Sequence, residues 1–187
     1  MKRKGQIWIS AVLYMALGVI VLTIILAAGV PMIQKMKDKN VFAQTKSLFF
    51  TLDQNIKDVS TEGPGSKRYL SPFDVKAGSL DVDSEKDWVT WQLRTKAKLM
   101  EPSYDFKENP TGVPEFREGS LFMYAQDTNI VDEYFLNLKL DYTGTADIHL
   151  QSQFEGPYTG SYSVAIRHNG TYNPDTQLPI VIVEFTV

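Results

Sequence analysis

The sequence contains few residue types that could carry catalysis. Its two histidines, His149 and His168, are not surrounded by clusters of histidines or carboxylates, and the 187-residue chain has no cysteine. Metal ligands and nucleophiles act in groups, such as several ligands around an ion or a nucleophile beside its base. The chain also lacks the short motifs of serine hydrolases, zinc proteases and phosphate-binding loops. We therefore expect structural or solvated histidines, no enzymatic activity and no cofactor.

An acidic run, DVDSEKD, places alternating carboxylates at Asp81, Asp83, Glu85 and Asp87. This spacing is similar to part of a calcium-binding loop, in which alternate side chains supply oxygen ligands. The run lacks the glycine that the sharp turn of such a loop requires. We expect a solvated turn between two strands and no metal ion.

The triplet Asn169-Gly170-Thr171 fits the acceptor pattern for N-glycosylation. Asn-Gly is also a dipeptide that favours tight hairpin turns. We expect an exposed turn here and name Asn169 as a candidate glycosylation site, which would place this part of the chain outside the cell.

The overall charge argues against a nucleic-acid partner. The chain has 19 basic and 22 acidic side chains and a formal net charge of −3. Binding to phosphates requires clustered Lys and Arg. An aromatic content of 12% is too high for a disordered tail, so we expect a folded domain.

The elements that position these residues begin with an apolar N-terminal segment. No charged residue occurs from Ile7 to Ile33. As a helix this segment would be about 40 Å long, whereas the hydrocarbon core of a bilayer is about 30 Å thick. The segment could be a permanent anchor, a helix retained after a nearby cut, or a secretion signal cut near Gly29. The length of this segment argues against a secretion signal, because a signal peptide has an apolar core of only about 7–15 residues.

Residues 34–62 are predicted to continue this helix with an apolar stripe on one side. Gly63-Pro64-Gly65 is expected to end it. A sheet is expected to cover the stripe. Its apolar residues recur at a mostly helical spacing: Met32, Ile33, Met36, Val41, Phe42, Leu48, Phe49, Leu52, Ile56 and Val59.

Residues 66–187 change to the alternation of strands, in which successive side chains point to opposite faces. The predicted fold class is therefore α+β, with a long N-terminal helix followed by an antiparallel β-sandwich or barrel-like head outside the cell. The expected strands cover residues 79–82, 89–99, 120–124, 134–142, 146–152, 162–166 and 178–187.

The start of the chain, Lys4-Gly5-Gln6-Ile7, resembles the class III signal of archaeal type IV pilin-like proteins, the family that includes archaellins. The resemblance implies that a prepilin peptidase removes residues 1–5 by cutting between Gly5 and Gln6. Residues 6–33 would then be the retained membrane and filament-core helix. Many pilins carry Glu at the fifth mature position, where this chain has Ser10. Some archaeal members begin Gln-x-Ser-x-Glu, whereas this chain has Trp8 at the third mature position.

The resemblance implies a structural subunit that polymerises through its N-terminal helix. Its partners would be other copies of itself, the membrane, prepilin peptidase and the pilus assembly machinery. The subunit would lie in the cell membrane before assembly and in a surface filament afterwards, with adhesion, motility, DNA uptake and minor-pilin roles all open. The alternative is an uncut, membrane-anchored extracellular β-domain that acts as an adhesin or binding module.

Overall fold

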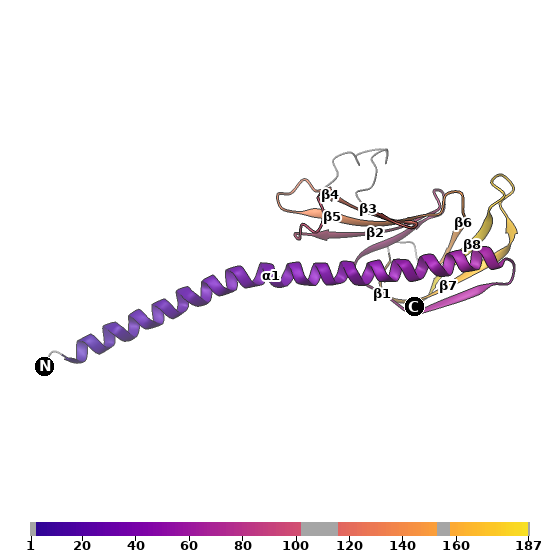
Figure 1. Ribbon diagram of the computed structural model, residues 1–187. Helices are drawn as coiled ribbons and strands as arrows, with labels where there is room; N and C mark the ends of the chain where they lie inside the picture. The colour runs from indigo at the N-terminus through magenta and orange to yellow at the C-terminus, as the bar shows by residue number, and fades with distance from the viewer. Residues whose placement is uncertain (1–2, 102–115, 153–157, 187) are drawn as a thin grey trace. The chain divides into compact units, whose positions relative to one another are not determined.

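The structure is a computed structural model that describes residues 3–101, 116–152 and 158–186. The chain forms two compact units, residues 1–38 and residues 39–187, and each is described by itself. Helix α1 (Arg3–Glu62) is continuous in backbone conformation and contributes residues to both units (Figure 1).

The described part of the first unit consists of helical residues 3–38, a segment that includes Pro31. A helix satisfies its own backbone hydrogen bonds, which is a condition for crossing a bilayer. The hydroxyl of Thr23 donates to the carbonyl of Val19 at 2.8 Å, so this polar side chain is also satisfied within the helix. By length and composition α1 is apolar enough to span a membrane.

The second unit combines the later part of α1 with one eight-stranded sheet. The sheet order is β3-β4-β5-β2-β1-β7-β8-β6. The strands are β1 (Lys67–Asp83), β2 (Trp88–Thr95), β3 (Phe116–Glu118), β4 (Leu121–Asp127), β5 (Tyr134–Asp141), β6 (Asp147–Ser152), β7 (Tyr158–Tyr172) and β8 (Pro179–Thr186).

The α+β class with a mostly antiparallel sheet is confirmed, and the structure adds two details of the sheet. The sheet is not closed, because β3 and β6 are its two edge strands and do not pair with each other. The sheet is also not fully antiparallel, because β6 pairs with β8 in parallel. Strand β8 pairs with β7 in antiparallel orientation on one side and with β6 in parallel orientation on the other.

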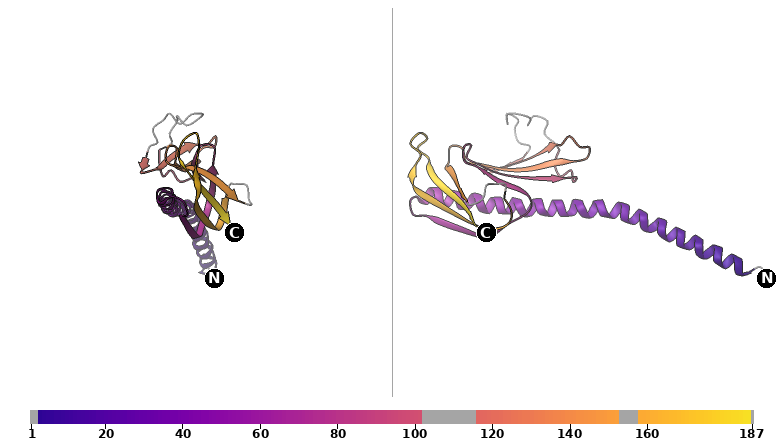
Figure 2. Two further views of the ribbon diagram at one scale, coloured as in Figure 1. Left: turned by 90° about the vertical axis from the view of Figure 1, so that its right-hand side faces the viewer. Right: turned by 180° about the vertical axis from the view of Figure 1, so that it is seen from behind.

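Strand β1 joins the two halves of the sheet, which Figure 2 shows from two further sides. Its later residues, from Ser79, pair with β2. Its pairing with β7 runs from Lys67 to Leu80 and shifts register at two places. The sequence predicted only residues 79–82 of this 17-residue strand. Gly78 has a φ of +78°, and a Cβ there would lie 2.4 Å from the carbonyl oxygen of Gln92. The close approach of β2 therefore requires glycine at this position.

The predicted apolar stripe of α1 packs against the sheet. Phe49, Leu52, Ile56 and Val59 are at most 1% exposed and belong to one core cluster with the strands. Their spacing of three or four residues places them on one face of the helix. The helix ends at Glu62, directly before Gly63, as predicted.

The stripe is shorter than predicted. Met32, Ile33 and Met36 retain 65%, 57% and 64% exposure and are not part of the core. The core contribution of the helix begins with the partly buried Val41 and Phe42. These three exposed side chains belong to the first unit, in which the described residues are all helical.

Candidate functional site

The predicted processing residues lie at the start of α1. Lys4, Gly5 and Gln6 are helical in backbone, and their side chains are outside the described part of the structure. The motif is thus placed two to four residues before the described apolar side chains begin at Trp8. Its role in processing stays a prediction.

The apolar side chains that follow are exposed on every side of the helix. Trp8 and Ser10, the two residues that depart from the family start motif, are both exposed. Fully burying a large apolar side chain contributes about 1.5–3 kcal/mol, so this helix leaves tens of kcal/mol of burial unrealised in water. The arrangement suits burial in lipid or against other helices. Its large exposed side chains are Trp8, Ile9, Val12, Leu13, Tyr14, Met15, Leu17, Val19, Ile20, Val21, Leu22, Ile24, Ile25, Leu26, Val30, Met32, Ile33 and Met36.

A buried polar contact fixes the later part of α1 on the sheet. The hydroxyl of Tyr142, which follows β5, donates to a carboxylate oxygen of Asp53 at 3.2 Å. The other oxygen of Asp53 accepts from the ammonium group of Lys57 at 2.7 Å. Burial, and then the neighbouring Asp53 carboxylate, raise the pKa of Tyr142 well above its ordinary value. The contact therefore holds a neutral phenol against the helix over the whole physiological pH range.

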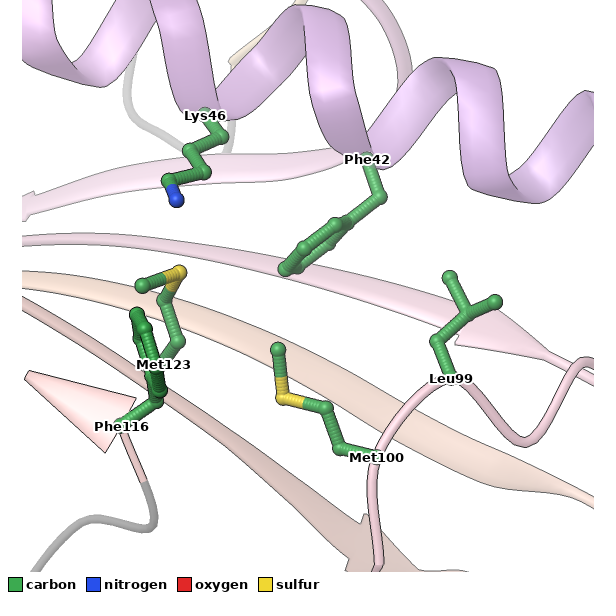
Figure 3. Close-up of a pocket in the computed structure, with 6 residues that line it drawn as sticks. All are labelled: Phe42, Lys46, Leu99, Met100, Phe116 and Met123. Carbon is green, nitrogen blue, oxygen red and sulfur yellow. The ribbon is translucent and has the colours of Figure 1, made fainter.

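An apolar hollow of about 400 Å³ lies between α1 and the sheet within the second unit (Figure 3). The charged group in its lining is Lys46, whose ammonium lies 2.7 Å from the carboxylate of Glu118. Since this cation is already paired, the hollow favours an apolar occupant over an anion. Its lining residues are Phe42, Lys46, Leu99, Met100, Phe116 and Met123.

The acidic run forms the β1–β2 turn, as predicted. Asp83 accepts backbone hydrogen bonds from Glu85 and Lys86 at 3.0 and 3.2 Å. Asp81 is exposed on β1. Asp83 therefore acts as a turn former. Within the described ranges, no group of three or more His, Asp or Glu side chains could hold a metal ion.

The same turn covers part of an edge strand. Asp87 accepts from the backbone N–H of Ile148 at 3.0 Å, and the hydroxyl of Ser84 accepts from the N–H of Leu150 at 3.0 Å. Both donors belong to β6, so the turn occupies groups that could otherwise pair with another chain. Burial and then the nearby Asp147 raise the pKa of Asp87, although the hydrogen bond from Ile148 opposes this shift.

The two histidines lie in different environments. His149 is exposed on β6, with its Nε2 3.1 Å from a carboxylate oxygen of Asp147. His168 is buried in β7, where its Nδ1 accepts from the backbone N–H of Gly170 at 2.9 Å. Its ring also packs edge-on against Tyr172, with a centroid distance of 5.7 Å. These contacts place His168 in a packing role.

Asn169 and Gly170 do not form the predicted hairpin turn. Both lie inside β7, where the pairing with β8 shifts register between His168 and Tyr172. The chain reverses later, at residues 173–178. Asn169 is nevertheless exposed, and its amide donates to the hydroxyl of Thr171 at 3.1 Å. The sequon thus lies at an exposed register shift within β7, and its glycosylation stays a prediction.

Sequence reasoning missed one surface feature, the pair Ile130-Val131 in the loop between β4 and β5. Both side chains are exposed. The available signal was an adjacent apolar pair inside the polar run DTNIVDE, where turn-forming residues are usual.

Comparisons with known proteins give no relative of this chain. No protein-family model, no curated protein and no solved structure matches it.

Proposed function

We propose that this chain is a structural subunit of a type IV pilin-like surface filament of the archaeal kind. A single observation carries the proposal: one helix is apolar and exposed on every side over Trp8–Ile33, yet its later residues are built into the core of a folded head. Such a helix needs an apolar environment, whereas the head is stable in water. A filament core of packed helices supplies that environment after the helix leaves the bilayer.

Processing at Gly5–Gln6 makes this transfer physically reasonable. The cut removes Lys2, Arg3 and Lys4, the charges that precede the apolar run. Placing a charged side chain in an apolar core is costly, so their removal favours packing of the helices. Subunits that repeat the same head-to-tail contact then form an open helical polymer.

The alternative function is an uncut, membrane-anchored extracellular β-domain that acts as an adhesin or binding module. The same exposed helix supports it, because by length and composition it could cross a bilayer. The two functions differ in the fate of residues 1–5.

The substitution Gly5→Val in the native cells tests the proposal. We expect the precursor to accumulate in the membrane and shed filaments to disappear, because the peptidase requires the small residue before the cut. Ala11→Val is the matched control for processing, since it adds side-chain bulk beyond the cut, and we expect residues 1–5 to be removed from it as from the unaltered chain. Unchanged filaments in the Gly5→Val strain would contradict the proposal and favour the anchored domain.

A further inference from the structure

The β4–β5 loop, residues 128–133, is held in one conformation by its own hydrogen bonds. The backbone N–H of Thr128 donates to the carbonyl of Glu133 at 3.2 Å, and the N–H of Glu133 donates to the carbonyl of Ile130 at 3.3 Å. The hydroxyl of Thr128 donates to the carbonyl of Glu133 at 2.9 Å. Arg94 of β2 also forms an ion pair with Glu133. The loop is therefore an organised structure.

This organised loop presents two apolar side chains to solvent. Ile130 is 51% exposed and Val131 is 87% exposed. No large apolar side chain on the described part of the apolar helix is as exposed as Val131, since the maximum there is 76% at Met15. Single exposed apolar residues are common, but two adjacent ones at the tip of a fixed loop are not explained by packing within the subunit.

Local structure does not explain the pair either. Positions at a loop tip favour Asn, Asp, Gly, Pro and Ser, whereas Ile and Val favour strands. The β7–β8 loop, residues 173–178, provides a comparison within the same head. It is also closed by backbone hydrogen bonds, from Asn173 to Leu178 and from Gln177 to Asn173 at 2.8 Å each. Its exposed tip is Pro174-Asp175-Thr176, so this fold makes a hairpin of similar length without exposed Ile or Val at the tip.

A matching surface is exposed in the first unit. Met32, Ile33 and Met36 are unburied, and the exposed Lys35 and Lys37 lie between and beside them. The loop tip has the opposite flanks, because Asp127 and Asp132 are both exposed beside Ile130-Val131. The two surfaces are therefore complementary, since both are apolar and their flanking charges are opposite in sign. Methionine adapts readily to the shape of a partner.

We propose that Ile130 and Val131 of one subunit pack on Met32, Ile33 and Met36 of a second copy of the chain. This contact rests on the proposed function, because it is a head-to-helix contact between filament subunits. It joins two different surfaces, so each copy can use both at once and the contact extends without closing. A lipid surface is a poorer partner for the loop tip, since anionic headgroups repel the acidic residues that flank Ile130 and Val131.

The absence of native cysteine allows a direct test by disulfide cross-linking. Copies with Val131→Cys and copies with Met36→Cys, carrying tags of different mass, are expressed together in the native cells, and filaments are oxidised. We expect a disulfide-linked dimer that contains both tags. A chain with both substitutions is expected to give a ladder extending beyond dimers. Thr176→Cys with Met36→Cys is the matched control at the polar loop, and we expect no such dimer.

A second variant tests the contact without a cross-link. Val131→Asp is expected to lower the yield of filaments by about tenfold or more, because it places a charge in an apolar contact. The unfolding temperature of the head should not change, and Thr176→Asp should leave the yield unchanged. If the cysteine variants assemble poorly, the filament yield of Val131→Asp still tests the contact.

The outcomes separate this contact from the proposed function. Filaments that assemble without the mixed dimer, and that tolerate Val131→Asp, would overturn the contact and leave the filament function standing. A fast-migrating monomer without a ladder in the double variant would show a bond within one chain and would also overturn it. If the unaltered protein forms no filaments and no cross-link is found, both proposals fail.

Discussion

The clearest consequence of the two-unit organisation is that the same substitution in α1 destabilises the head at one position and leaves it almost unchanged at another. Leu52 is 0% exposed in the core of the head, whereas Leu22 is 56% exposed in the apolar helix. Leu52→Ala removes buried atoms and leaves a cavity, at a cost of about 2–5 kcal/mol. For a unit of this size each kcal/mol lowers the unfolding temperature by about 2–4 °C, so we expect a decrease of about 4–20 °C. Leu22→Ala should change the stability of the head by less than about 0.5 kcal/mol.

The assay is thermal unfolding of the full chain in detergent, followed by near-UV circular dichroism of the buried aromatic residues. Trp91 and Tyr142 are buried in the head, so this signal reports loss of its packing. Both variants carry the same chemical change in the same helix, and each serves as the control for the other. Equal unfolding temperatures for Leu52→Ala and Leu22→Ala would refute the assignment of these two positions to a core and a non-core surface.

Three further substitutions test individual contacts. Tyr142→Phe removes the hydrogen bond to Asp53 and should cost about 1 kcal/mol in urea unfolding. Because the folded-state pKa of Tyr142 is raised, the unfolded chain loses this proton first, so stability should fall as pH rises above about 10, and Tyr142→Phe should reduce that fall. Gly78→Ala should cost about 1–3 kcal/mol more than Gly119→Ala, because both have positive φ but only Gly78 meets close neighbours. If Asn169 is glycosylated, Asn169→Gln should lower the mass of native protein by one glycan, and an unchanged mass would reject the site.

Local periodicity was sufficient to predict the helix and its docked face. The spacing of Phe49, Leu52, Ile56 and Val59 matches the 3.6-residue period, and these side chains are buried as expected. Strands β2 and β5 were found because their polar and apolar residues alternate cleanly. In β2 one face is covered and the other is wetter, so the sequence pattern records burial directly, whereas in β5 Asn137 on the polar face is also buried.

Long-range pairing could not be predicted in the same way. Most of β1 was missed because Pro72 and Gly78 interrupt its alternation, and its partner β7 is distant in the sequence. The parallel pairing of β6 with β8 depends on where β7 lies, which no local pattern records. Asn169-Gly170 favours a hairpin locally, but the pairing of β7 on both sides places it inside a strand.

The candidate site was predictable only in part. The uncharged run from Ile7 indicated an exposed apolar helix, and α1 has that character. The length of the apolar stripe was overestimated, because spacing alone does not reveal where the covering sheet stops. Ile130-Val131 was overlooked because an apolar pair reads as a strand fragment until its loop is seen to be exposed.

The most direct test of the central claim is the intact mass of the chain in a filament fraction prepared from the native cells. The filament proposal predicts a mature chain that begins at Gln6, so residues 1–5 must be missing from the assembled protein. A chain that retains Met1 in filaments would contradict it and favour an uncut anchor. A chain that begins at Val30 would contradict it as well, because the apolar helix would then have been discarded.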